Sequence, residues 1–180
     1  MGNKRHRWAF FASKSTEVSF DLSGALYRIY TQPKFESDFS LLISAAIDTS
    51  LAQTLVHFVS EDSCLYQLVA IRHIHEVKHQ ATNVGKTNMT VNIEDIPRLN
   101  DIFNRTPAIA IFDDEGNLAY LGPYSTGIGC FSGNNTFEPY LDSKANLRAM
   151  IPLEATGCYC NKLIVTYWAF YHNTNQVQIN

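Results

Sequence analysis

The sequence predicts an α/β domain built on a central mixed sheet of about four strands, with helices on both faces of the sheet. The 180 residues are 46% apolar and 17% charged, which is typical of a chain that buries a sizeable core. Short runs rich in β-branched and aromatic residues alternate with segments whose apolar residues recur every three or four positions. Strands and helices that follow one another in turn produce this alternation.

Three regions are predicted along the chain. Residues 1–51 form a helical extension, 52–142 the α/β core, and 143–180 a tail packed on the core. Within residues 17–50 the apolar positions fall at helical spacing, and Pro33 separates two predicted helices. No linker rich in Pro, Gly or Ser divides the chain, so we expect a single domain overall.

In the first half of the core, the sequence predicts a strand, a helix, a second strand and a short helix. Thr54–Val59 is β-rich, and the apolar positions from Leu65 to about Gln80 have helical spacing. Cys64 therefore lies where a strand leads into a helix. Met89–Ile93 is predicted to be the second strand and Asp95–Asn104 a short helix.

In the second half of the core, the sequence predicts an antiparallel hairpin that is followed by a helix. Thr106–Pro107 precedes Ala108–Phe112, and a polar turn separates this run from Leu118–Leu121. Phe137–Leu141 begins another predicted helix. The pattern of Leu163–Tyr171 fits either a strand or a helix.

Composition excludes some function classes. The chain has fourteen Lys and Arg residues against seventeen Asp and Glu residues. The resulting net charge of −3 predicts no basic surface that would bind nucleic acid. No window reaches the ~18 apolar residues of a membrane span. The compartment stays open: a trimmed N-terminal anchor would place the domain in the bacterial periplasm or at a membrane, and otherwise it is cytoplasmic.

The order of elements carries a family resemblance. TLVHFVSEDSC (54–64) followed by MTVNIEDIPRLNDIFNRTPAIAIFDDEGNLAYLG (89–122) resembles the thioredoxin-like superfamily, with strand, short helix, X-Pro and hairpin in sequence. The match covers roughly residues 52–142. Within the superfamily it is most similar to poorly characterised bacterial proteins that have a Cys-Pro-Cys-like segment and a downstream histidine, on the strength of Cys64 and His73.

The resemblance implies a thiol-based redox protein that uses no cofactor. Cys64 would be the nucleophile, because a helix N-terminus favours its thiolate. Thr106 and Pro107, with a cis peptide bond, would form the substrate-binding edge. The partners would be protein or peptide thiols and disulfides held in an extended-chain groove.

The resolving thiol departs from the family pattern. In a C-x-x-C motif that begins at Cys64, the second cysteine would be at position 67, where this sequence has Gln67. In a Cys-Pro-Cys motif it would be at position 66, where this sequence has Tyr66. The glycine-rich loop 122–133 is expected to emerge near Cys64, which makes Cys130 a candidate resolving thiol. Cys158 and Cys160 form a C-x-C that is either a redox or soft-metal pair or a tail fixed to the core by disulfides.

Other interpretations remain open. His57 lies inside the first strand and is either a proton shuttle for Cys64 or a hydrogen-bonded core residue. Alternatively, a domain with this fold but without catalytic activity would be a module that binds a peptide or protein.

A zinc protease is a weaker alternative. His75 and His79 spell H-E-x-x-H, with a third ligand sought in Glu94 or Asp95. The charge of Lys78 and the apolar positions of the same helix argue against this metal site.

Overall fold

The computed structural model describes residues 18–60, 65–126, 134–142 and 148–161. Its centre is a sheet of four strands in the order β3-β2-β5-β6. These strands are β2 (Thr54–Val59), β3 (Thr87–Asn92), β5 (Ala108–Phe112) and β6 (Leu118–Pro123). β2 runs parallel to β3 and antiparallel to β5, and β5 runs antiparallel to β6. The predicted mixed α/β sheet of four strands is therefore confirmed.

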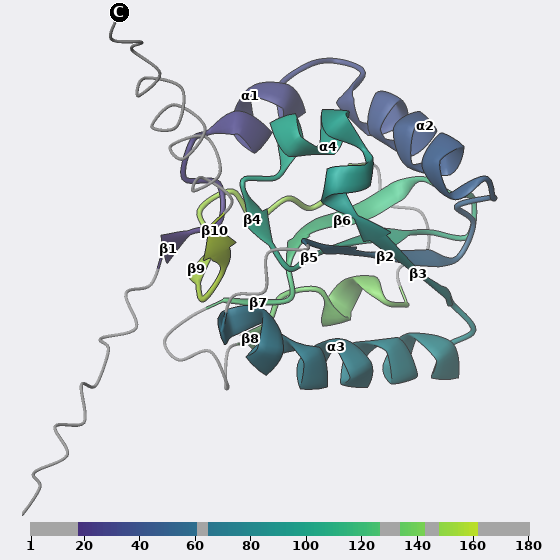
Figure 1. Cartoon of the computed structure of the whole chain (residues 1–180). Coiled ribbons are helices and arrows are strands. Elements are labelled where there is room, and N and C mark those ends of the chain that lie inside the picture. The colour runs from purple at the N-terminus through teal and green to yellow at the C-terminus, as the bar shows by residue number, and fades with distance from the viewer. Residues whose placement is uncertain (1–17, 61–64, 127–133, 143–147, 162–180) are drawn as a thin grey trace, which may run out of the picture.

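Helices cover both faces of this sheet (Figure 1). α3 (Leu65–Asn83) lies along one face, while α1 (Ala25–Tyr30), α2 (Phe35–Ile47) and α4 (Pro97–Ile102) lie on the other. Alternation along the strands explains the two layers, because successive side chains of a strand point to opposite faces. Val56 joins the core cluster of α2 and α4, whereas its neighbour Leu55 packs in the cluster of α3.

Three two-stranded ladders lie beside the main sheet. β1 (Val18–Ser19) pairs with β9 (Thr156–Gly157), β4 (Arg105–Thr106) with β10 (Cys160–Asn161), and β7 (Ser125–Thr126) with β8 (Asn134–Asn135). All three lie at the end of the sheet where α3 begins (Figure 1). They gather segments that are far apart in the sequence.

The segment 148–161 packs on the core. Met150 donates its N–H to the Ala119 carbonyl and accepts from Leu121 N–H, at 2.9 and 3.0 Å. These bonds cover the edge of β6. Ile151 and Tyr159 then join the main core cluster.

The elements differ from the sequence prediction in detail. Pro33 does separate two helices, but Phe137–Leu141 contains only the single 3₁₀ turn η2 (Glu138–Tyr140). A short apolar run cannot repay the cost of nucleating a longer helix. A second 3₁₀ turn, η1 (Ile93–Asp95), precedes α4. Leu163–Tyr171 lies outside the described residues.

Candidate functional site

The two residues predicted to bind a substrate, Thr106 and Pro107, lie at one end of the sheet. Near the end of β2, Phe58 pairs with Ala108 at the start of β5. Thr106 and Pro107, which are joined by a cis peptide bond, immediately precede Ala108. α3 begins at this same end, because Leu65 follows Val59 after a short connection (Figure 1).

Two of the predicted cysteines lie outside the described residues. Cys64 directly precedes Leu65, the first residue of α3, and Cys130 falls between β7 and β8 in the sequence. The nineteen residues of α3 form a helix long enough to develop a dipole whose positive end lies at Leu65. The roles of Cys64 and Cys130 stay predictions.

The backbone of Thr106, predicted to bind a substrate, already has a partner within the chain. Cys160 is the residue opposite Thr106 in the antiparallel ladder of β10 and β4, and Asn161 is opposite Arg105. β10 also lies close to α3. Cys160 is therefore placed between the strand edge at Thr106 and the helix that begins one residue after Cys64.

Cys158 and Cys160 are both disulfide-bonded, and neither described cysteine is a free thiol. Their surroundings differ, since Cys160 is 5% exposed and Cys158 is partly buried. Tyr159 between them is anchored by its hydroxyl, which donates to the Ser125 carbonyl at 3.1 Å, and by an edge contact with Phe20. The C-x-C segment is thus held firmly against the core.

His57 is a fully buried residue of β2, and both of its ring nitrogens are hydrogen-bonded. Nδ1 lies 2.5 Å from the Tyr124 hydroxyl and Nε2 lies 2.9 Å from Oδ1 of Asn88. The Asn88 amide nitrogen donates to the Lys78 carbonyl at 3.0 Å, which fixes Oδ1 as the acceptor. His57 therefore carries its proton on Nε2 and accepts from Tyr124 at Nδ1.

Burial controls the charge of this network. The pKa of His57 is lowered to about 4, and desolvation by burial is the largest cause. The hydrogen bond with Asn88 raises this pKa, whereas the charge of Lys78 lowers it. Burial also raises the pKa of Tyr124 above its ordinary value. At neutral pH the network is uncharged, which is the arrangement of a hydrogen-bonded core histidine.

Arg105 is a buried cation next to Thr106. Its side chain is 4% exposed, and its Nε has no hydrogen-bond partner within the described part of the chain. Burial lowers the pKa of this guanidinium, and Tyr159 opposes that shift. Arg105 therefore brings a buried positive charge into β4, one residue before Thr106.

The H-E-x-x-H segment lies on the solvent side of α3. His75 and His79 are exposed, while Ile74 and Val77 are buried against the sheet. Glu94, one of the two residues considered as a third ligand, accepts a hydrogen bond from Ser60 at 2.7 Å. In the described ranges no three His, Cys, Asp or Glu side chains gather in a way that could hold a metal ion.

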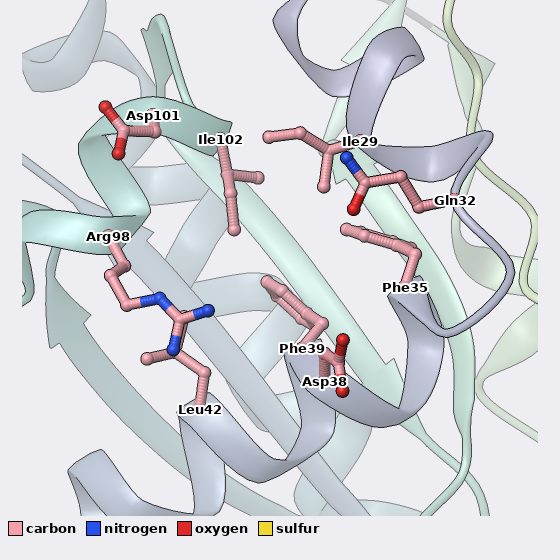
Figure 2. A pocket seen from close by; sticks show the side chains of 9 residues that line it. All are labelled: Ile29, Gln32, Phe35, Asp38, Phe39, Leu42, Arg98, Asp101 and Ile102. Atoms are coloured by element: carbon pink, nitrogen blue, oxygen red, sulfur yellow. The ribbon is translucent and has the colours of Figure 1, made fainter.

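A pocket of about 220 Å³ lies on the other helical layer, between α1, α2 and α4 (Figure 2). Phe35, Phe39 and Ile102 give it an apolar lining, and Arg98 and Asp101 add charge from α4. α3 covers the opposite face of the sheet (Figure 1). The pocket therefore lies on the face of the sheet opposite to α3.

Sequence reasoning missed several contacts of this region. Tyr124 and Asn88 are the partners of His57, and Cys160 rather than a foreign chain pairs with Thr106. Nothing in the local pattern marks these residues, because their partners are distant in the sequence. The one usable signal was a histidine inside an otherwise apolar strand, since a buried imidazole needs hydrogen-bond partners.

Comparison with known proteins adds a family. A domain of unknown function, DUF6436, matches residues 32–162. The chain belongs to the DUF6436 family. The matched DUF6436 region includes the whole four-stranded sheet and both members of the β4 and β10 ladder. No curated protein matches the chain, and no solved structure matches it. Among the described residues of this DUF6436 protein, no helix is long and apolar enough to cross a membrane.

Proposed function

We propose that this DUF6436 domain is a thioredoxin-like thiol–disulfide redox protein with Cys64 as its nucleophile. Two features of the fold support the proposal. The strand order β3-β2-β5-β6, with only β2 and β3 parallel, is the order expected of such a domain. Helix α3 connects β2 to β3 and begins at the residue after Cys64.

The single observation that carries the proposal is the pairing of Cys160 with Thr106. A disulfide-bonded cysteine lies on the strand edge predicted to bind substrate, close to the helix that follows Cys64. Sulfur chemistry at this edge needs a second sulfur within reach of the first. The pairing puts the Cys160 sulfur on this edge, whereas Gln67 occupies the usual position of the second cysteine.

The proposed reaction reduces a disulfide in a protein or peptide. The Cys64 thiolate attacks one sulfur of the substrate disulfide, which breaks the substrate S–S bond and releases one substrate thiolate. A second protein thiolate then attacks the Cys64 sulfur and releases the other substrate thiolate. Two electrons pass from the two protein thiols to the substrate, and the protein keeps a new disulfide.

The position of Cys64 directly before α3 supports a thiolate over a thiol. The positive end of a helix dipole lies at the helix N-terminus and favours a negative charge there. His57 supports the reaction through structure rather than proton transfer, since both of its nitrogens are already bonded.

The test is differential alkylation of the reduced full-length chain across a pH series, followed by peptide mass spectrometry. We expect Cys64 to react with iodoacetamide below neutral pH, because a helix N-terminus favours the thiolate of a cysteine. Slow reaction of Cys64 at neutral pH would overturn the proposal and favour the non-catalytic binding module. Metal analysis of the same sample checks the zinc alternative.

A further inference from the structure

The pocket between α1, α2 and α4 combines an apolar base with a polar rim (Figure 2). Phe35, Phe39 and Ile102 form the base, since they line the pocket and are 5%, 2% and 8% exposed. The rings of Phe35 and Phe39 stack, with their centroids 5.7 Å apart and their planes at 27°. The volume of about 220 Å³ lies below the ~300–1,000 Å³ of sites for larger ligands. The pocket therefore suits one small apolar group.

Two opposite charges lie on the rim, on different helices. Arg98 belongs to α4 and Asp38 to α2, and both residues are exposed and line the pocket. Figure 2 shows the Arg98 guanidinium directed from α4 toward α2, whereas the Asp101 carboxylate points away from the pocket. Within the described ranges, the side chains of Arg98 and Asp38 form no hydrogen bond and no ion pair, with each other or with other residues. Both charges are therefore available to a ligand.

These features together define the chemistry of the ligand. An apolar group that enters the base is removed from water, and an aromatic ring gains further from contact with the two stacked phenyl rings. The guanidinium of Arg98 binds a carboxylate through parallel hydrogen bonds. The carboxylate of Asp38 attracts an ammonium group and repels a ligand whose only charge is negative. A ligand with all three groups is a zwitterion with an aromatic side chain.

We propose that this pocket binds a free α-amino acid with an aromatic side chain. The ligand carboxylate binds Arg98, its ammonium group binds Asp38, and its ring lies on Phe35 and Phe39. The site goes beyond the proposed redox function and does not depend on it. All of its residues lie on the face of the sheet opposite to α3, and no cysteine lines the pocket.

The experiment is a titration of the ¹⁵N-labelled full-length chain with L-phenylalanine, followed in ¹H–¹⁵N correlation spectra. We expect saturable shifts of the amide signals of α2 and α4, which locate the site and give the Kd. Two comparison ligands each lack one charge: 3-phenylpropionate has no ammonium group and phenethylamine has no carboxylate. Each should bind on the order of tenfold more weakly than L-phenylalanine, and L-serine, which lacks the ring, should bind more weakly still.

Matched variants assign the two charges. Arg98→Gln and Asp38→Asn should each raise the Kd for L-phenylalanine on the order of tenfold. Arg72→Gln, an exposed arginine of α3, and Asp101→Asn, whose carboxylate points away from the pocket, should leave the Kd unchanged. All four residues are exposed, so these changes do not disturb the core, and the correlation spectra of the variants check the fold.

Three results would overturn the inference. The first is the absence of saturable shifts up to about 10 mM L-phenylalanine, or shifts confined to α3 and the strands. The second is equal binding of 3-phenylpropionate and L-phenylalanine, which would show that Asp38 does not select a zwitterion. The third is an unchanged Kd in Arg98→Gln. Alkylation of Cys64 is measured separately, so either proposal can fail while the other stands.

Discussion

Cys160 lies directly opposite Thr106 across the ladder of β10 and β4. A segment near the end of the described chain thereby covers a strand edge near the middle of the sequence. The same cysteine is buried and disulfide-bonded, and the strand that carries it lies close to α3. The edge predicted to receive a substrate is thus filled by the chain itself.

The attachment of this segment depends on a close approach at Gly157. A Cβ added there would lie 2.7 Å from the Tyr159 hydroxyl oxygen and 2.9 Å from Cζ of the same ring. We expect Gly157→Ala to lower the free energy of unfolding by about 1–3 kcal/mol, because the buried ring has little room to shift. Urea denaturation measures this change. In a Tyr159→Phe background, which removes the nearest atom, the cost of Gly157→Ala should shrink; an unchanged cost would mean that the ring does not oppose the methyl group.

Stability should fall with acid because of His57. Its pKa is about 4 in the folded chain against 6.5 for the free side chain, so the unfolded chain binds the proton more readily between these values. Stability from this group is complete above pH 6.5 and is lost as the pH falls toward about 4, by roughly 3 kcal/mol in total. Urea denaturation over this range measures the slope. His57→Gln should flatten it, and an identical slope in both proteins would contradict the prediction.

Removing the Tyr124 hydroxyl should destabilise the buried network. The hydroxyl donates to Nδ1 of His57, which lies inside the core. Tyr124→Phe leaves this nitrogen without its donor, and we expect a loss of about 1–3 kcal/mol in the free energy of unfolding. Thermal and urea denaturation give the value. Tyr27→Phe is the control, because Tyr27 is 56% exposed and its change should be near zero.

Asp113 stabilises the turn between β5 and β6. Its Oδ1 accepts the N–H groups of Glu115 and Asn117 at 3.0 and 2.8 Å, and the residue is 1% exposed. Asp113→Ala should cost about 1–2 kcal/mol, since two partly buried hydrogen bonds to the turn backbone are lost. Asp113→Asn keeps a carbonyl oxygen and should cost less. Equal losses in the two variants would show that the charge, rather than the acceptor geometry, stabilises the turn.

The exposed histidines of α3 should be dispensable. His75→Ala and His79→Ala change side chains on the solvent side of the helix, so we expect stability within about 0.5 kcal/mol of the unaltered chain. Metal analysis should give the same zinc content for all three proteins. Zinc that is present in the unaltered chain and absent from both variants would revive the H-E-x-x-H interpretation.

Local patterns were sufficient to predict most of the sheet and its helices. The strand at 54–59 was predictable because a strand that is buried on both faces is a nearly continuous apolar run. The helix from Leu65 was predictable because a helix with one buried face has apolar residues at every third or fourth position. Ile74, Val77 and Ala81 of α3 lie in the core cluster on that basis. The sequence predicted the start of a longer helix where the structure has the 3₁₀ turn Glu138–Tyr140. So few apolar residues are too short a sample to show a helical period.

The sequence by itself determined the order of the elements and the faces that they bury, since both depend on the spacing of apolar side chains along a few turns or strands. Only the tertiary structure decided which residues surround His57 and which strand pairs with β4. Backbone N–H and C=O groups are the same in nearly every residue, so a two-residue ladder has no signature of its own. Cys160 meets Thr106 because packing of residues 148–161 on β6 and the core carries the chain to that edge.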